Sequence, residues 1–506
     1  MTLGIETELR GARAVDLAEE RSRGERRAHW DAVARRWERR RGLGGAYHRR
    51  LERVYGFLVP PGSRVLELGC GRGDLLAALR PASGVGVDFS PETLRQARAR
   101  HLGHPELRFV EADAEALAET LSEALADSFD GRRFDAIILS DLVNDAWDVQ
   151  RLFEQVRALA GPQTRIVLNL YSRVWEPALL LAQRLGLAHP VLPQNWLTVD
   201  DVENLLRLSG LRPIRRWQEV LLPLPVPLLA AFCNRVLVRL WPFNHLALAN
   251  FVVARPAPQA LPEEPVVTVV VPARNEAGNV PAIFDRVPEM GAGTDLVFVE
   301  GHSTDDTYAA IEREIATRAA SPGGRRARLL RQQGKGKGDA VRAGFAAARG
   351  DVLMILDADL TVPPDELPRF YEVIRSGMGE FVNGVRLVYP MEKQAMRFAN
   401  LLGNKFFSLA FSWLIGQRIK DTLCGTKVIH RRDYERLAAN RAYFGDFDPF
   451  GDFDLLFGAS KLNLEIVELP VRYRERTYGT TNIQRWRHGW LLLQMCVFAA
   501  GRLKLV

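Results

Sequence analysis

The stretch Arg64-Val65-Leu66-Glu67-Leu68-Gly69-Cys70-Gly71-Arg72-Gly73 decides the fold of the N-terminal half of the chain. A short apolar run ends in three glycines that alternate with other residues, which is typical of a buried strand that leads into a tight loop. Glycine permits positive φ and lets a ligand approach the backbone closely. A helix that follows such a loop points its free N–H groups at the ligand. We therefore predict a strand, a ligand-binding loop and a helix, in that order.

The same alternation of strands and helices continues on the C-terminal side. Short buried strands that alternate with helices predict a mainly parallel, doubly wound α/β sheet. In the N-terminal half the predicted strands are Arg64–Leu68, Gly84–Val87, Leu107–Glu111, Asp135–Leu139 and Arg165–Asn169, and the predicted helices include Asp74–Leu79 and Pro91–Arg100. In the C-terminal half the predicted strands are Val266–Val271, Asp295–Val299 and Val352–Leu356, and the predicted helices are Val280–Val287 and Tyr308–Ala319.

A chain of 506 residues is too long for one hydrophobic core, so two or three domains are expected. The segment from Ala254 to Pro265 contains four prolines, which block both a helix and a central strand and so predict a linker. The predicted segments are an arginine-rich helical arm (1–45), a first domain (46–254), a linker (255–265), a second domain (266–489) and an apolar and basic C-terminal helix (490–506).

The charge and cysteine content narrow the class of protein. The net charge is +7, and arginine is concentrated between Arg21 and Arg53, where it forms either a solvated helix face or a contact with anionic lipid or an acidic partner. We expect no nucleic-acid partner, because no nucleic-acid module accompanies the charge. The four scattered cysteines fit a reducing cytosol and argue against a zinc site or a disulfide framework.

Two carboxylates accompany the glycine loop. Asp88 ends the second predicted strand, where it can accept hydrogen bonds from both hydroxyls of a ribose. Asp113 follows the third strand and suits an adenine amino group. The ends of these strands converge on one edge of a doubly wound sheet. The sequence therefore predicts a site for a nucleoside cofactor.

This pattern resembles the class I S-adenosylmethionine-dependent methyltransferases over about residues 46–255. The resemblance implies a Rossmann-like domain in which Ser140–Asp145 is where the family often meets its substrate. It implies the cofactor-binding residues Glu67, Gly69, Gly71, Gly73, Asp88 and Asp113, with the glycines at the methionine end. The methyl acceptor stays open, and candidate residues of the pocket wall are Tyr47, His48, Tyr171, Trp175, Asn195 and Trp196. A nicotinamide-binding domain and a degenerate domain without catalysis are the alternatives; the first has a different glycine spacing.

A second site is predicted around Asp357-Ala358-Asp359, which follows an apolar strand. Alternation within a strand would place both carboxylates on one side. Carboxylate oxygens suit a hard divalent cation, Mg²⁺ or Mn²⁺, and phosphate oxygens can complete its coordination. Such a cation neutralises charge on a departing nucleotide diphosphate. Glycines and lysines from Gly334 to Gly338 suit a pyrophosphate or form a solvated loop.

This second pattern resembles the inverting GT-A glycosyltransferases over about residues 265–490, and most closely the polyprenyl-phosphate sugar synthases such as dolichyl-phosphate mannose synthase. The resemblance implies metal binding by Asp357 and Asp359 and an acceptor-phosphate site at Arg386 and Arg397. It implies donor-binding residues at Pro272, Asn275, Glu276, Glu300, Lys335, Lys337, Asp357 and Arg476. The chain departs from the family at Glu300-Gly301-His302, where relatives carry Asp-Asp-Gly, and at Thr361 and Asn482, where relatives carry an amide and a lysine.

The acceptor determines whether the enzyme needs a base. A lipid phosphate is already an anion, whereas a sugar or protein hydroxyl must lose a proton. Asp421, Asp452 and Asp454 are the candidate bases for a hydroxyl acceptor, and we count Asp357, Asp359, Asp452 and Asp454 as the catalytic candidates.

Membrane contact is expected to be peripheral. The segments Arg397–Ile415 and Trp490–Ala500 are apolar with basic and aromatic flanks, which suits a bilayer interface, an ordinary core or a dimer contact. Leu221–Leu240 comes near the length of a span, but prolines, Asn234 and arginines interrupt it.

The sequence as a whole predicts a bifunctional enzyme on the cytoplasmic face of a membrane. Its C-terminal half would transfer a hexose from a nucleotide-sugar to a polyprenyl phosphate, and its N-terminal half would methylate an unknown acceptor. A glycosyltransferase that carries a non-catalytic methyltransferase-like module is the alternative. The sugar, the donor base and the oligomeric state stay open.

Overall fold

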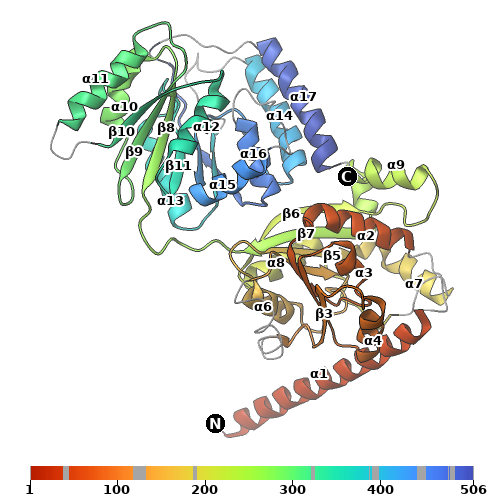
Figure 1. Cartoon of the computed structure of the whole chain (residues 1–506). Coiled ribbons are helices and arrows are strands. Elements are labelled where there is room, and N and C mark those ends of the chain that lie inside the picture. Colours follow the sequence, from red (N-terminus) through yellow and green to blue (C-terminus); the bar gives the residue numbers. More distant parts are fainter. Residues whose placement is uncertain are drawn as a thin grey trace. The chain divides into compact units, whose positions relative to one another are not determined.

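The computed structural model describes residues 2–37, 45–117, 133–185, 191–320, 325–386, 388–389, 398–441, 452–476, 478 and 485–504. The chain divides between Ala257 and Pro258 into two compact units, each built on its own seven-stranded sheet with helices on both faces (Figure 1).

The sheet of the first unit has the strand order β3-β2-β1-β4-β5-β7-β6. Strands β1 to β5 are parallel, and β7 runs antiparallel to both β5 and β6. The strands are β1 (Arg64–Leu68), β2 (Ser83–Asp88), β3 (Leu107–Glu111), β4 (Ala136–Ser140), β5 (Arg165–Tyr171), β6 (Leu211–Glu219) and β7 (Ala249–Pro256). The α-helices are α1 (Thr2–Trp37), α2 (Gly45–Leu58), α3 (Asp74–Ala78), α4 (Pro91–Arg100), α6 (Val149–Leu159), α7 (Glu176–Arg184), α8 (Val199–Leu208) and α9 (Leu229–Arg235).

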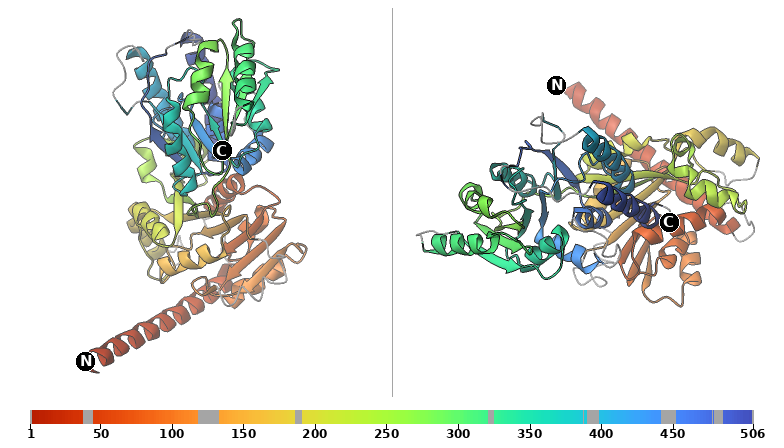
Figure 2. Two further views of the ribbon diagram at one scale, coloured as in Figure 1. Left: turned by 90° about the vertical axis from the view of Figure 1, so that its left-hand side faces the viewer. Right: turned by 90° about the horizontal axis from the view of Figure 1, so that it is seen from above.

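Alternation along the strands of the first unit supplies two cores, one on each face of its sheet. Leu66 and Leu68 of β1 belong to one buried cluster, and Val65 between them belongs to the other. Strand β4 divides in the same way, with Ile137 in the first cluster and Ile138 in the second. Helix α1 lies against the unit with its C-terminal part, while its N-terminal end extends away from the sheet in both views of Figure 2.

The sheet of the second unit has the order β10-β9-β8-β11-β13-β12-β14, in which β13 runs antiparallel to both neighbours. The strands are β8 (Val267–Ala273), β9 (Thr294–Glu300), β10 (Ala327–Arg331), β11 (Val352–Ile355), β12 (Phe381–Val385), β13 (Lys427–His430) and β14 (Ile466–Pro470). The α-helices are α10 (Val280–Arg286), α11 (Thr307–Ala319), α12 (Lys337–Ala347), α13 (Leu367–Arg375), α14 (Phe398–Ile415), α15 (Arg431–Ala439), α16 (Asp452–Lys461) and α17 (Arg485–Leu503).

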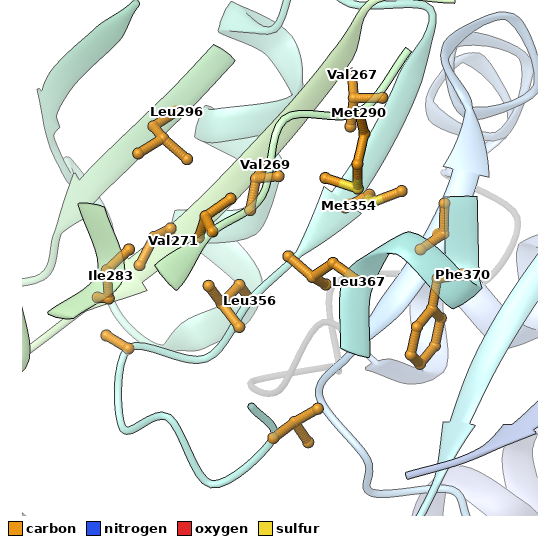
Figure 3. Close-up of a cluster of buried hydrophobic side chains, with 14 of the residues drawn as sticks. Val267, Val269, Val271, Ile283, Met290, Leu296, Met354, Leu356, Leu367 and Phe370 are labelled. Atoms are coloured by element: carbon orange, nitrogen blue, oxygen red, sulfur yellow. The ribbon is translucent and has the colours of Figure 1, made fainter. Parts of the chain in front are cut away.

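The core of the second unit is built by one face of β8. Val267, Val269 and Val271 alternate along this strand and pack with Met354 of β11 and Phe370 of α13 (Figure 3). Strand β8 is parallel to both of its neighbours, β9 and β11. The carboxyl ends of the three strands therefore lie at one edge of the sheet. The polar residues of the predicted donor site follow these ends.

The predicted α/β class with two doubly wound domains is confirmed, and three boundaries differ. Strand β7 continues through Arg255 and Pro256, which we assigned to the linker; Pro256 is tolerated because it is the last residue of the strand. Strand β11 ends at Ile355, so Asp357 and Asp359 follow the strand and do not alternate within it. Helix α17 begins at Arg485, five residues before the expected start.

Candidate functional sites

The glycine loop of the first unit has the predicted conformation. Gly69, Gly71 and Gly73 all have positive φ, of 69°, 53° and 72°. A Cβ on Gly73 would lie 2.5 Å from the ring of Phe109, so this position has no room for a side chain. The chain passes from β1 through these glycines to the start of α3 at Asp74. The loop therefore has the tight, glycine-dependent turn that lets a ligand approach the backbone closely.

Asp88 is tied directly to this loop. Its Oδ2 accepts a hydrogen bond from the N–H of Gly71 (3.0 Å), and its Oδ1 accepts one from the N–H of Ser90 (2.9 Å). Burial raises the pKa of Asp88 to about 6, although the two backbone donors oppose the shift. Glu67 on β1 is also buried, and burial raises its pKa to about 8. Two predicted cofactor residues, Gly71 and Asp88, are thus in contact.

Asp113 is held by the arginine-rich helix α1. The Nε of Arg23 lies 2.6 Å from Oδ2 of Asp113, and Arg27 pairs with Glu111 at 2.6 Å. Arg26 reaches Glu115, 3.4 Å away. The sequence left the partner of these arginines open, and the structure supplies carboxylates of the same unit at the end of β3. The spacing of Arg23, Arg26 and Arg27 could have predicted a common binding face, because residues three and four apart lie on the same side of a helix.

The segment after β4, where the resemblance predicts contact with a substrate, carries a polar cluster around Asp141 that includes Tyr47 of the predicted pocket wall. Oδ1 of Asp141 accepts hydrogen bonds from the hydroxyl of Tyr47 (2.7 Å) and from Nδ2 of Asn169 (2.5 Å). Asp141 has a φ of 56°, which is uncommon for a residue other than glycine and often marks a functional site. Burial raises the pKa of the Asp141 carboxyl group.

The position of this cluster suits a methyl acceptor. A Cβ on Gly69 would lie 3.1 Å from Cδ1 of Leu142, so the loop after β4 is adjacent to the glycine loop. A carboxylate there can accept a hydrogen bond or a proton from an acceptor. Of the other predicted wall residues, Trp175 donates to the carbonyl of Leu246 (2.8 Å) and Asn195 donates to the carbonyl of Asn144 (2.7 Å), which are structural contacts.

Arg476 joins two predicted site residues of the second unit. Its Nη1 lies 3.0 Å from Oε1 of Glu276, and its Nη2 lies 2.7 Å from Oδ2 of Asp359. Asn279 donates to the second oxygen of Glu276 (2.8 Å). Burial raises the pKa of Glu276 to about 7, against the opposing effect of the Arg476 charge. The segment after β14 thus reaches the loops that follow β8 and β11.

Asp357 has a different cation. Its Oδ1 lies 2.5 Å from Nζ of Lys337, at the start of α12. Burial acts to raise the pKa of Asp357, but Lys337, Lys427 and Arg386 together outweigh it and hold the pKa below its usual value. Gly425 packs so closely that a Cβ there would collide with both the Asp357 carboxylate and Nζ of Lys337.

The two aspartates fit a divalent cation by their chemistry. Both offer hard oxygen ligands, and Lys337 and Arg476 beside them supply charge for phosphate oxygens. Thr361 donates its hydroxyl to Oδ1 of Asp359 (2.8 Å), which fixes the orientation of that carboxylate. Within the described part of the chain, no three acidic, histidine or cysteine side chains gather into a metal-binding group.

The remaining residues predicted to bind the donor lie around the end of β9. Oε1 of Glu300 accepts from the N–H of Ser303 (2.5 Å), and Oδ1 of Asn275 accepts from the N–H of Thr304 (2.7 Å). Asn275 and Glu300 thus both accept hydrogen bonds from the loop that follows β9. Pro272 lies on β8 beside them, and Lys335 is exposed in the loop before α12.

The predicted acceptor residues have partners of their own. Nε and Nη2 of Arg386 donate to the two carboxylate oxygens of Asp421, at 2.7 and 2.8 Å. Arg386 holds the pKa of the fully buried Asp421 well below its usual value, although burial alone would raise it. This pairing argues against Asp421 as a base. Asp454 forms an ion pair with Arg441 at 2.8 Å. Arg397 and the side chain of Asp452 lie outside the described residues.

Helices α14 and α17 pack against each other and divide their apolar residues between core and surface. Phe411 and Ala499 are buried, whereas Leu409, Trp490 and Val497 are 74%, 63% and 68% exposed. Among the described residues, no helix combines the length and hydropathy that crossing a bilayer requires. An interfacial contact and a dimer contact both remain open for the exposed face.

Comparisons with known proteins assign each unit. Residues 268–438 match the family model of glycosyl transferase family 2, and residues 60–195 match a methyltransferase domain model. The low-salt glycan biosynthesis hexosyltransferase of Haloferax volcanii is 28% identical over 244 residues, which are 47% of this chain and 55% of the relative. The dolichyl-phosphate hexose transferase of the same organism is 29% identical over 212 residues, which are 42% of this chain and 82% of the relative.

Other similarities are shorter or more distant. The undecaprenyl-phosphate 4-deoxy-4-formamido-L-arabinose transferase of Edwardsiella ictaluri is 36% identical over 115 residues, which are 22% of this chain and 34% of the relative. The chain thus spans about half of the length of this hexosyltransferase and about a third of the length of this arabinose transferase.

Two solved structures have low overall similarity to the chain. Glucosyl-3-phosphoglycerate synthase from Mycobacterium tuberculosis has 19% identity and a TM-score of 0.35, covering 47% of this chain and 80% of that one. Magnesium protoporphyrin IX methyltransferase from Synechocystis has 16% identity and a TM-score of 0.32, covering 46% and 99%. The two family matches show that the chain joins a methyltransferase domain to a family 2 glycosyltransferase domain.

Proposed function

We propose that the second unit transfers a hexose from a nucleotide-sugar to a polyprenyl phosphate with inversion at the anomeric carbon. The observation that supports this most is the bridge that Arg476 forms between Glu276 and Asp359, beside the pair of Asp357 and Lys337. Three carboxylates and two cations pair there, at the strand ends where a nucleotide diphosphate would lie. The curated relatives named as transferases that use dolichyl or undecaprenyl phosphate favour a lipid phosphate as the acceptor.

The proposed transfer needs charge stabilisation more than proton transfer. An oxygen of the acceptor phosphate would attack the anomeric carbon while the bond to the nucleotide diphosphate breaks. Arg476 and Lys337 would stabilise the negative charge that develops on the leaving diphosphate. A divalent cation held by Asp357 and Asp359 would supply further neutralising charge when bound. No residue has to act as a base, because the acceptor phosphate is already an anion.

The test uses nucleotide-sugars, Mg²⁺ or Mn²⁺ and undecaprenyl phosphate, with lipid-linked sugar as the product. Arg476→Ala is expected to lower the transfer rate by about a hundredfold or more, because it removes a charged group that faces the leaving diphosphate. Arg474→Ala is the matched control, since Arg474 is an exposed residue of the same segment. The absence of lipid-linked sugar with every donor would exclude this function.

We propose that the first unit binds S-adenosylmethionine and transfers its methyl group. The contact of Asp88 with Gly71 in the glycine loop supports a cofactor site, and Asp141 supplies a carboxylate for the acceptor. Calorimetry with S-adenosylmethionine tests the cofactor site, and Asp88→Ala should abolish binding. If the wild-type protein does not bind this cofactor, the non-catalytic module is favoured instead.

A hydroxyl acceptor is the second candidate for the glycosyl transfer. It would need a base, for which Asp452 and Asp454 are the candidates. A hydroxyl acceptor is supported if Asp452→Asn or Asp454→Asn abolishes transfer and lipid has no effect on the rate.

For the lipid-phosphate reaction we propose peripheral attachment to the cytoplasmic face of a membrane, through the exposed apolar side chains of α14 and α17.

A further inference from the structure

The connection between β6 and β7, residues 220–248, is far longer than an ordinary hairpin loop. It contains α9 (Figure 1) and two short 3-10 helices, Leu237–Arg239 and Phe243–Leu246. Asn234 fixes its conformation, because Oδ1 accepts from the N–H of Leu222 and Nδ2 donates to the carbonyl of the same residue, both at 2.8 Å. We call residues 220–248 the β6–β7 surface.

The β6–β7 surface exposes an unusual amount of apolar area. Ten large apolar side chains between Leu224 and Leu246 are each more than a third exposed. They include Leu228 (88%), Trp241 (78%) and Phe232 (52%). Leu228 also has a φ of 59°, which is an outlier for a bulky side chain. Soluble proteins rarely expose contiguous apolar patches of this kind unless something covers them.

The charge of the surface shows what could cover it. No aspartate or glutamate occurs from residue 220 to residue 248, and Arg235 and His245 in this stretch are exposed, whereas the side chain of Arg239 is buried and pairs with Glu219. Burial, Arg50 and Arg235 all lower the pKa of Arg53 on α2, so cations cluster at this side of the unit. Aromatic and aliphatic side chains together with cations, and without carboxylates, are typical of segments that lie in the headgroup region of a bilayer.

We propose that the β6–β7 surface inserts its apolar side chains into the headgroup region of a membrane that contains anionic lipids. A second copy of the same surface fits less well, because a symmetric contact would bring like cations together. The inference depends on the proposed function in one respect, because a lipid acceptor is what would bring the chain to a membrane. The surface itself belongs to the first unit, whereas α14 and α17 belong to the second.

The test is co-sedimentation of the full chain with vesicles of phosphatidylcholine, with and without phosphatidylglycerol. The wild-type chain should bind the vesicles that contain phosphatidylglycerol. The double variant Phe232→Ser/Trp241→Ser should bind them at least about tenfold more weakly, since tenfold corresponds to about 1.4 kcal/mol and two large side chains lose their burial. Leu102→Ser/Leu208→Ser is the matched control, because these leucines are 85% and 61% exposed on the same unit.

Two further variants sharpen the test. Arg235→Glu should weaken binding to vesicles with phosphatidylglycerol, because it reverses a charge beside the apolar side chains. Leu409→Ser/Val497→Ser changes exposed residues of α14 and α17 instead. If this pair abolishes binding while Phe232→Ser/Trp241→Ser has no effect, the inference is wrong.

Two other outcomes would also overturn it. One is a wild-type chain that binds no vesicles, and the other is a Phe232→Ser/Trp241→Ser chain that only changes from dimer to monomer in sedimentation velocity. Hexose transfer to undecaprenyl phosphate in detergent reports separately on the proposed function. Vesicle binding through this surface, without any transfer in detergent, would refute the proposed function and leave this inference standing.

Discussion

Asp88 ends β2 with a half-buried carboxylate that already accepts hydrogen bonds from Gly71 and Ser90. Its acid–base behaviour therefore depends on burial as much as on its chemical type. Burial also acts to raise the pKa values of Glu276 and Asp357 in the second unit. The pKa of Glu276 is raised, whereas nearby cations, Lys337 first among them, lower the pKa of Asp357.

The pKa of about 6 for Asp88 predicts a pH-dependent affinity for S-adenosylmethionine. Only the ionised carboxylate accepts hydrogen bonds from both ribose hydroxyls, so binding below this pKa must displace a proton. The affinity should rise with pH up to about 6, by as much as about tenfold per pH unit, and then level off. Calorimetry measures it, with Asp88→Asn as a control that binds weakly without this pH dependence. A wild-type affinity that does not change across the range would contradict the prediction.

Gly425 provides a second prediction for a single residue. A methyl group at this position would collide with the pair of Asp357 and Lys337, so Gly425→Ala must separate the two side chains. We expect at least about a tenfold loss of hexose transfer, since displacing a catalytic group by about an ångström has large effects. Gly403→Ala is the control, because a Cβ there has no neighbour within 4 Å. Unchanged transfer in Gly425→Ala would show that this pair is not needed.

At the scale of elements, helix α1 contacts the edge of the first sheet where the cofactor is predicted to bind. Arg23 and Arg27 pair with carboxylates at β3, and Oδ1 of Asp31 accepts a hydrogen bond from the hydroxyl of Ser90 (2.5 Å), which caps α4. A charged and mostly polar helix is thereby held by ion pairs and hydrogen bonds. Exposed pairs contribute little individually, so the buried or shared contacts should dominate.

Asp31→Ala should therefore loosen α1. The variant removes a charged hydrogen-bond acceptor, and such bonds contribute about 1.5–3 kcal/mol, which corresponds to at least about a tenfold change in opening. Hydrogen exchange of the α1 amides measures this change. Glu25→Ala is the control, because the side chain of Glu25 is 65% exposed and pairs only with Arg21. Equal protection of α1 in both variants would contradict the proposed attachment.

At the scale of the whole molecule, the two units have separate hydrophobic cores. A ligand stabilises the unit that binds it, by about 2.7 kcal/mol at a hundred times its Kd. S-adenosylmethionine should therefore raise the midpoint of one thermal transition, and Mn²⁺ with the donor nucleotide should raise the midpoint of the other. Scanning calorimetry tests this, and Asp88→Ala should lose only the first shift. A single transition that responds to both ligands would show that the units unfold together.

Much of the fold could be predicted from local sequence. The strands Arg64–Leu68 and Leu107–Glu111 and the helix Pro91–Arg100 have the predicted bounds, because apolar runs, glycine and a capping serine act over a few residues. The convergence of the glycine loop and Asp88 on one edge of the sheet was also predicted from sequence, because parallel strands end at one edge, and the structure adds the hydrogen bond between Gly71 and Asp88. The position of Asp357 was predicted less well, because the strand ends two residues before it.

The sequence by itself thus determined two α/β domains and their resemblance to two families, and it predicted loops that would carry the sites. Only the tertiary structure decided which charges pair. Arg476 meets Glu276 across 200 residues of sequence, and Arg26 meets Glu115 across 89. Asp141 likewise receives its hydrogen bonds from Tyr47 and Asn169, on distant elements. The physical reason is that alternation and turn residues act locally, whereas a charge carries no information about its partner until packing brings the two together.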